Sequence, residues 1–310
     1  MALAILCPGQ GGQHSGMFAL TGDAPEAAGL FAHAAGLLGG KEPRELVRDG
    51  EALHRNRTGQ ILCTVQALAA AAALRDAMPS RIIVAGYSVG EVAAWGVGGL
   101  LGAADTLDLV ASRAEVMDAA TQPGDGLTFV RGLSREVIDR LCERHDAAVA
   151  IVNPGDAYVL GGRRSALHAL AAEAEAMRAS RVVDLPVEVA SHTKRLAAAS
   201  AAFRERLRTL SPTFPPPAGT RILSGVDGAT VSSIEAGLDK LAAQISQTVQ
   251  WASCLQSCIE AGATAFLELG PGHALSAMVA SAWSDVPTRS LEDFRSLQGA
   301  RTWLARRADS

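Results

Sequence analysis

The feature that most constrains this chain is the pentapeptide Gly86-Tyr-Ser-Val-Gly90, because of the segments on either side of it. The preceding residues 81–85, Arg-Ile-Ile-Val-Ala, read as a short buried strand, and the apolar segment 92–101 follows. A Gly-x-Ser-x-Gly motif between a strand and a helix is typical of the sharp turn that presents a serine hydroxyl at the end of a parallel strand. The alternative is an ordinary glycine-rich turn whose serine is idle.

Strand-like and helix-like segments alternate on both sides of this motif. Residues 3–7 form an apolar run that ends at the loop Pro8-Gly-Gln-Gly-Gly-Gln13, and the Ala-rich stretch 61–74 reads as a helix buried on most sides. The glycine loop fits neither the dinucleotide nor the P-loop pattern and by itself reads as a tight turn. Further helices are expected over about 104–120, 193–210 and 234–246 and from residue 250, with strands at 221–224 and, as the last core strand, at 265–269. This alternation favours a parallel sheet with helices on its faces.

The order of the expected strands and helices changes between residues 127 and 187. The expected elements there are strands at 127–130, 147–152, 157–161 and 181–185, with helices at 134–144 and 164–178. Their order, βαββαβ, is that of the ferredoxin-like unit. We therefore expect a small subdomain at 124–187, inserted into a large body made of residues 1–123 and 188–310.

Composition and charge exclude several functional classes. A formal net charge of −4 provides no overall basic field for nucleic acid or an anionic membrane. The five cysteines are scattered, without zinc-ligand spacing or a Cys-x-x-Cys pair, as expected of reduced thiols in a protein without a metal site. The N-terminus lacks a basic n-region, and the uncharged stretch 58–74 is short for a membrane span. A soluble, cytoplasmic protein that binds neither nucleic acid nor membrane is expected.

A serine nucleophile needs a base, and seven histidines compete for this role. His192 ends the segment 185–191, at the return from the small subdomain to the large body, where clefts form. A histidine that merely satisfies an interface is the alternative. The other six fall on polar helix faces or in loops, where a solvated side chain is the default: His14, His33, His54, His145, His168 and His273.

Arg113 is the most informative charge. Its neighbours three and four positions away on the expected helix are all apolar, so an acid on the same helix cannot pair with it. Burying an unpaired guanidinium is costly, so its partner must come from elsewhere. That partner is either a structural carboxylate or a substrate carboxylate held by the bidentate fork, and the residues alone do not choose.

Six ordered segments together resemble the malonyl-CoA:acyl-carrier-protein transacylase family over essentially the whole chain. They are Pro8-Gly-Gln-Gly-Gly-Gln13, Gly86-Tyr-Ser-Val-Gly-Glu91, Ser112-Arg-Ala-Glu-Val-Met117, Ala190-Ser-His192, Thr248-Val-Gln-Trp251 and Glu268-Leu-Gly-Pro-Gly272. The resemblance implies an α/β-hydrolase-like large subdomain that carries the ferredoxin-like insertion. It also implies an enzyme that moves malonyl from malonyl-CoA to the thiol of an acyl carrier protein, with the coenzyme A thioester as substrate and no permanently bound cofactor.

The resemblance assigns roles to the matching residues. Ser88 would be the nucleophile and His192 its base, while the backbone amides of Gln10 and Val89 would form the oxyanion hole. Arg113 would clamp the free carboxylate of the malonyl group.

Three further polar residues are expected around the substrate. In the family a main-chain carbonyl near the late glutamine, here Gln250, orients the histidine in place of an acid. Gln60 and Asn153 are similar to polar residues that support the site from behind.

Two positions depart from the family pattern. Tyr87 stands where the family usually has a histidine before the serine, and Ile61 stands where a proline usually follows the glutamine. Tyr87, Val89 and the run Ala93-Ala-Trp-Gly-Val-Gly-Gly99 resemble the transacylase (epsilon) subunit of malonate decarboxylase, whose carrier bears a phosphoribosyl-dephospho-coenzyme A arm. This predicts that the protein primes malonate decarboxylase and has the other subunits of that enzyme as partners.

Three alternatives stay open. One is a malonyl transacylase of fatty-acid or polyketide synthesis, and another is a serine esterase that delivers the acyl group to water. The third is a non-catalytic subunit that grips an acidic carrier through Lys194 and Arg195, beside His192.

Overall fold

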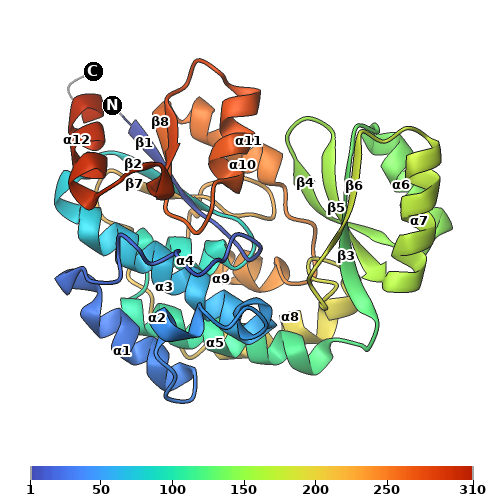
Figure 1. The fold of residues 1–310 in the computed structure, drawn as a ribbon, viewed down its shortest axis with the longest axis horizontal. Coiled ribbons are helices and arrows are strands. Elements are labelled where there is room, and N and C mark those ends of the chain that lie inside the picture. Colours follow the sequence, from blue (N-terminus) through green and yellow to red (C-terminus); the bar gives the residue numbers. More distant parts are fainter. Residues whose placement is uncertain (1, 309–310) are drawn as a thin grey trace.

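The computed structural model describes residues 2–308, and a five-stranded parallel sheet lies at its centre (Figure 1). The strands follow the order β7-β2-β1-β8-β9. Their bounds are β1 (Ala2–Cys7), β2 (Ile82–Gly86), β7 (Thr220–Ile222), β8 (Ala263–Glu268) and β9 (Thr288–Ser290). Because β1 and β2 pair in parallel up to Cys7 and Gly86, the loops that follow these two strands emerge side by side at one edge of the sheet.

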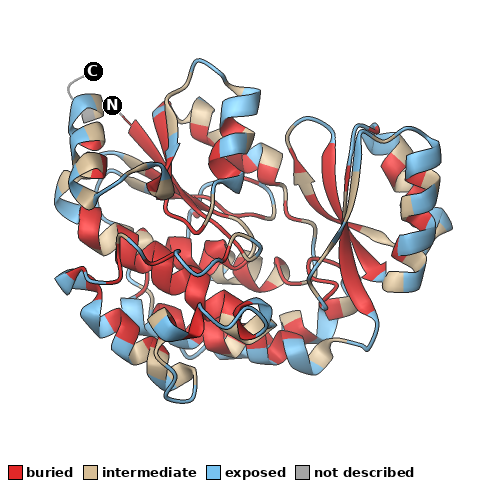
Figure 2. Cartoon of the chain, viewed as in Figure 1, coloured by how far each residue is buried: buried red, intermediate tan, exposed pale blue. Residues whose placement is uncertain are grey.

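Helices cover both faces of this sheet, so the central strand β1 is buried along its whole length. The odd positions of β1 face one hydrophobic cluster and the even positions face another (Leu3, Ile5 and Cys7; Ala2, Ala4 and Leu6). A strand buried on both faces is expected to be apolar throughout rather than alternating, as residues 3–7 are. Figure 2 shows the consequence, with buried residues concentrated in the central strands and in the helices directly against them.

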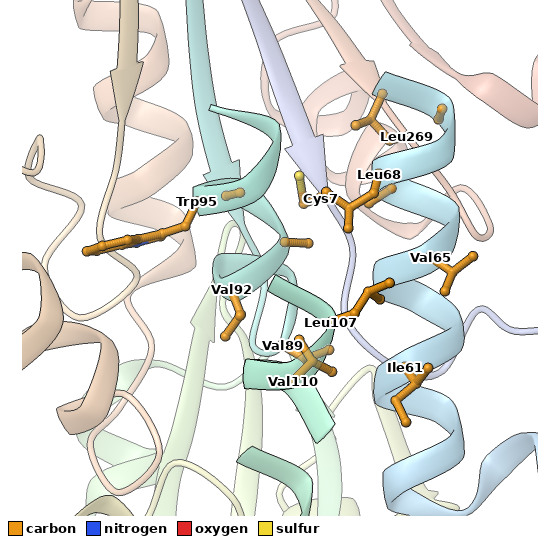
Figure 3. Close-up of a cluster of buried hydrophobic side chains, with 14 of the residues drawn as sticks. Cys7, Ile61, Val65, Leu68, Val89, Val92, Trp95, Leu107, Val110 and Leu269 are labelled. Carbon is orange, nitrogen blue, oxygen red and sulfur yellow. The ribbon is translucent and has the colours of Figure 1, made fainter. Parts of the chain in front are cut away.

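Two sets of helices make these layers. The first cluster takes in α1 (Ala28–Leu37), α3 (Asn56–Leu74), α4 (Gly90–Val97), α5 (Ala103–Ala120), α8 (Ala197–Leu207), α9 (Ile234–Ala243) and α12 (Leu297–Ala308). The second takes in α10 (Trp251–Glu260) and α11 (Ala274–Ala282), and the short α2 (Pro43–Leu46) precedes α3. Figure 3 shows how α4, which begins directly after the serine turn, is held between α3 and α5 by side chains such as Ile61, Val92 and Val110.

The small sheet lies apart from the central one and is antiparallel (Figure 1). It consists of β3 (Asp125–Arg131), β4 (Ala148–Asn153), β5 (Ala157–Arg163) and β6 (Arg181–Leu185) in the order β4-β5-β3-β6. The helices α6 (Arg135–Arg144) and α7 (Arg164–Ala176) cover its outer face. This is the predicted βαββαβ unit with the strand order of the ferredoxin-like fold, so the expected fold class is confirmed, while the boundaries at 123/124 and 187/188 stay a prediction.

Most of the expected elements occur where the sequence placed them, and the differences concern their ends. The helix expected from residue 234 ends at Ala243, so that Gln244 is its C-cap. The helix expected from Thr193 starts as a 3-10 turn at Lys194–Leu196, because the Thr193 side chain caps the amide of Arg195. Five elements were not expected from the sequence, namely α1, α2, α11, α12 and β9. Across residues 2–308 the structure contains no helix that is both long and apolar enough to cross a membrane.

Candidate active site

Ser88 lies in the sharp turn between β2 and α4, with a left-handed backbone φ of 56°. The two glycines of the motif allow this turn to sit against the end of the sheet. A Cβ at Gly86 would lie 2.1 Å from the backbone of Gly90, and one at Gly90 would lie 2.0 Å from the Cys7 carbonyl oxygen. Larger residues cannot occupy these positions without displacing backbone, so the glycines serve the geometry that presents the serine.

His192 contacts the serine directly. Its Nε2 lies 2.8 Å from the Ser88 Oγ, and its Nδ1 lies 2.6 Å from the main-chain carbonyl oxygen of Gln244. Because a carbonyl can only accept, the hydrogen is on Nδ1, and Nε2 is left to accept the hydroxyl hydrogen of Ser88. The ring is therefore held in the tautomer that a general base requires.

The environment of His192 also keeps the ring neutral. The side chain is buried, and burial together with the positive charge of Arg113 lowers its pKa to about 3. A neutral imidazole can take the proton of an attacking hydroxyl, whereas an imidazolium cannot.

Arg113 is buried with 1% of its surface exposed, and its partners come from elsewhere in the chain, as expected, but they are amides and not a structural carboxylate. Its Nη1 donates to the Gln60 side-chain oxygen at 2.7 Å and its Nη2 donates to the Gln244 side-chain oxygen at 3.1 Å. Gln60 is in turn held by the Asn56 side chain. Two neutral amide oxygens thus hold the guanidinium, which leaves its charge without a directly bonded carboxylate.

Gln244 is the residue that the sequence analysis missed. Its carbonyl orients His192, its side-chain oxygen accepts from Arg113, and its side-chain nitrogen donates to the Ser88 carbonyl oxygen at 2.9 Å. One residue therefore ties the nucleophile, the base and the arginine together.

The prediction that the carbonyl near Gln250 orients the histidine was wrong by six residues. Val249 pairs with β4 of the small sheet, and Gln250 then begins α10 with its amide donating to the Gly225 carbonyl. The chain has therefore turned away from His192 before Gln250. The only signal in the sequence was three glutamines in one segment, at 244, 247 and 250, which gives no ground for choosing between them.

Gln10 lies in the loop that follows β1, and Val89 follows the serine. This loop is pressed against the serine turn, since a Cβ at Gly9 would lie 2.7 Å from the Tyr87 carbonyl oxygen and 3.4 Å from the Ser88 Cβ. Within residues 2–308 neither the Gln10 amide nor the Val89 amide donates to another group. Both amides are thus available beside Ser88, as an oxyanion hole requires.

Asn153 ends β4 on another side of the serine turn. It is 4% exposed, and neither atom of its side-chain amide has a hydrogen bond in residues 2–308. It lies next to the Tyr87 hydroxyl, and the Tyr87 ring packs edge-on against Trp251 with the centroids 5.3 Å apart. Asn153 also lines a cavity of about 290 Å³ between the small sheet and α11.

Another cavity is larger, at about 800 Å³. Its walls come from the large body, at Gln10 and Asn56, and from the two chain crossings to the small sheet, near Gln122 and Val189. Gln10 thus belongs both to this cavity and to the loop beside Ser88.

None of the other six histidines contacts Ser88 in the described residues, and five of them contact an acidic side chain instead. His14 and His273 contact Glu292, His33 contacts Asp108, His145 contacts Glu173 and His168 contacts Asp184, while His54 lines the larger cavity. Among the described residues, no three His, Cys, Asp or Glu side chains cluster so that they could hold a metal ion.

Known proteins share both the sequence and the fold. A family model described as the acyl transferase domain matches residues 5–293. The malonyl CoA-acyl carrier protein transacylase of Mycobacterium tuberculosis is 34% identical over 302 residues, which are 94% of this chain and 96% of the relative. The acyl-carrier-protein S-malonyltransferase of Burkholderia pseudomallei is 28% identical with a TM-score of 0.89, covering 97% of this chain and 100% of that one.

A second similar structure contains a partner. It is a malonyl-transacylase in complex with a type II polyketide acyl-carrier protein, 26% identical with a TM-score of 0.89, covering 97% of this chain and 99% of that one. A family match over most of the chain and a relative above 30% identity leave one assignment. The chain belongs to the acyl transferase family, that of the malonyl-CoA:acyl-carrier-protein transacylases, and is an enzyme.

Proposed function

We propose that this enzyme moves malonyl groups from malonyl-CoA to the thiol of an acyl carrier protein through an ester on Ser88. The observation that carries the proposal is the 2.8 Å contact between the Ser88 Oγ and a neutral His192, beside the buried charge of Arg113. The first two groups activate a hydroxyl, and the third provides a reason to prefer an acyl group that bears a carboxylate.

In the first half-reaction His192 takes the hydroxyl proton as Ser88 attacks the thioester carbonyl. The oxyanion that forms is stabilised by the amides of Gln10 and Val89, and a donor of this kind typically contributes about 3 kcal/mol. The bond to sulfur then breaks and His192 returns the proton to coenzyme A. In the second half-reaction the carrier thiol attacks the malonyl-serine ester by the same steps, which gives ping-pong kinetics.

Arg113 is suited to hold the free malonyl carboxylate. A guanidinium has five N–H groups, and Gln60 and Gln244 each take one from a different terminal nitrogen. Each terminal nitrogen therefore keeps one N–H that neither glutamine takes, and a carboxylate that accepts from both would be held in the bidentate mode.

The similar proteins support a transacylase of fatty-acid or polyketide synthesis, because their names give malonyl CoA and acyl carrier protein as substrates. Priming of malonate decarboxylase is a second candidate, and Tyr87 favours it. Its ring packs on Trp251 and its hydroxyl lies next to Asn153. That arrangement places a large side chain with a polar end where the family usually has a histidine.

The test is intact mass measurement after mixing the enzyme with malonyl-CoA and then with a carrier protein. We expect a malonyl adduct that is absent in Ser88→Ala and that the carrier removes. Loss of the adduct as free malonate, without a carrier and as fast as the carrier removes it, would instead indicate an esterase. Carrier binding without any adduct would indicate a non-catalytic carrier-binding subunit.

A further inference from the structure

Glu91 is a buried carboxyl group that the catalytic steps above do not use. It lies in the first turn of α4, three residues after Ser88, and only 1% of its surface is exposed. Its Oε2 accepts a hydrogen bond of 2.6 Å from the side-chain nitrogen of Gln244. The backbone of Gly225 approaches so closely that a Cβ there would lie 2.6 Å from the same oxygen.

The hydrogen bonds of Gln244 connect Glu91 to Arg113. The Gln244 nitrogen faces Glu91, and the oxygen of the same amide faces the Arg113 Nη2. An ionised carboxylate can only accept and a guanidinium can only donate. The two charges therefore determine the orientation of the Gln244 amide, which links Glu91 to Arg113 by two hydrogen bonds.

The other titratable groups packed around Glu91 do not supply a charge. The Cys254 thiol of α10 has a pKa raised by burial, and His192, beyond Gln244, has a lowered one, so both are neutral at pH 7. With Glu91 ionised, the buried group of Glu91 and Arg113 carries no net charge. A malonyl carboxylate that bound Arg113 would add a second negative charge where there is one positive charge.

We propose that Glu91 is a positioning residue for the acyl carboxylate: through Gln244 it is the counter-charge of Arg113 in the empty enzyme, and it takes up a proton from solvent when a diacid acyl group occupies that arginine. This inference rests on the proposed function, in particular on the role of Arg113. Acyl transfer from the thioester to Ser88 consumes no proton, because the hydroxyl proton leaves on coenzyme A. A free thiol with a pKa of about 8.5 releases part of that proton at pH 8, and it does so equally per acyl-enzyme formed for a malonyl and an acetyl donor. Uptake of a proton would thus report on Glu91.

The pKa of Glu91 supports the proposed proton uptake. Burial raises its pKa to about 7, while hydrogen bonds from Gly225, Gln244 and Ser224 and the charge of Arg113 lower it less. The carboxyl group is therefore poised between its two states near neutral pH. A second carboxylate on the same arginine raises the pKa of Glu91 further, since a like charge nearby favours the protonated form.

The experiment counts protons during acyl-enzyme formation. Enzyme is mixed with malonyl-CoA at pH 8 in weak buffer with an indicator dye, and intact mass gives the amount of acyl-enzyme formed. Measured relative to the acyl-enzyme formed from acetyl-CoA, we expect an uptake approaching one proton per malonyl-enzyme at pH 8, falling towards none as the pH drops to about 5.5, where Glu91 is already protonated in the free enzyme. Acetyl-CoA, which lacks the carboxylate, should cause no comparable uptake.

Two variants separate this role from a structural one. Glu91→Gln keeps the size of the side chain and an oxygen for Gln244 but cannot titrate, so malonyl-enzyme should form without proton uptake. Glu268→Gln is the matched control, because Glu268 is also buried with a pKa raised to about 7, yet it binds the amides of Leu275 and Ser276. We expect this control to take up protons like the wild type.

Each outcome has one meaning. Malonyl-enzyme without proton uptake in the wild type, or equal uptake in Glu91→Gln and the wild type, would refute the role of Glu91 and leave the transacylase proposal standing. Absence of any malonyl adduct in the wild type would refute the transacylase proposal itself. If Glu91→Gln fails to fold, the comparison of malonyl-CoA with acetyl-CoA on the wild type still decides, and equal uptake from both donors would contradict the inference.

Discussion

Two sides of Ser88 differ in how completely their polar groups are paired. On the arginine side, formed by Gln60, Glu91, Arg113 and Gln244, the buried side chains hydrogen-bond to one another. On the asparagine side, formed by Tyr87 and Asn153, the Asn153 amide is buried without a hydrogen bond and lines a cavity. The amide of Asn153 lies next to the Tyr87 hydroxyl, so this side lacks the connected network of the arginine side.

The difference indicates that the two sides do different work. Paired groups hold Arg113 and His192 in place before a substrate arrives, which is the preorganisation that favours a transition state. The asparagine side instead lines a cavity, so its residues are suited to contact what binds there. If so, changes on the arginine side should alter stability and acyl selectivity together, and changes on the asparagine side should alter substrate binding alone.

The largest effect is expected for Arg113→Ala. Removal of one partner of a buried charge-assisted pair costs about 2 kcal/mol or more, so kcat/KM for malonyl transfer should fall by at least ~30-fold. Transfer of acetyl groups, which cannot use the guanidinium, should fall much less. The measurement is kcat/KM for both donors with the same carrier, and equal losses would refute the clamp.

A matched pair of substitutions separates the two sides by stability. Gln60→Leu leaves the Arg113 Nη1 and the Asn56 side chain without their partner, which should lower the free energy of unfolding by about 1–3 kcal/mol. Asn153→Leu removes an amide whose polar neighbour is the Tyr87 hydroxyl, outside the network around Arg113, so it should lower that free energy by less, about 1 kcal/mol or below.

Urea unfolding of the two variants and the wild type provides the measurement. Equal destabilisation by both substitutions would remove the distinction between the sides. If the two sides differ as proposed, we also expect Asn153→Leu to raise the KM for malonyl-CoA with little change in kcat.

A smaller effect is expected for Tyr87→His, which tests the asparagine side for arm selectivity. A single side-chain contact typically discriminates by about 1–3 kcal/mol at most, so the ratio of transfer rates to two carrier arms should change by several-fold. The two carriers should differ only in the arm, phosphopantetheine against the phosphoribosyl-dephospho-coenzyme A form. A wild type that prefers the phosphoribosyl arm, with the preference lost in Tyr87→His, would favour malonate decarboxylase. No preference in either protein would favour fatty-acid or polyketide synthesis.

The sequence predicted the parts of this site whose constraints are local. A Gly-x-Ser-x-Gly turn after an apolar strand is sufficient to place Ser88, and the apolar neighbours of Arg113 on its own helix show that its partners lie elsewhere. The partners themselves could not be predicted from the sequence, because Gln60 and Gln244 lie 53 residues before and 131 residues after the arginine. Their amides meet it only once α3, α5 and the segment after α9 have packed. The same holds for Glu91, which looks like an ordinary first-turn acid until the fold buries it.

The smallest effect is expected from pH, and it shows how far the influence of Arg113 extends. A histidine base works in its neutral form, and an ordinary histidine with a pKa near 6.5 would lose about tenfold of that form between pH 8 and 5.5. The pKa of His192 is lowered to about 3 by burial and by Arg113, so the neutral form persists over this whole range. At saturating malonyl-CoA Glu91 is already protonated under the proposal above, so it does not titrate either. Single-turnover formation of the malonyl-enzyme should therefore vary by less than about twofold from pH 8 to 5.5. A tenfold fall with a midpoint near 6.5 would mean that His192 is not shielded as its burial beside Arg113 requires.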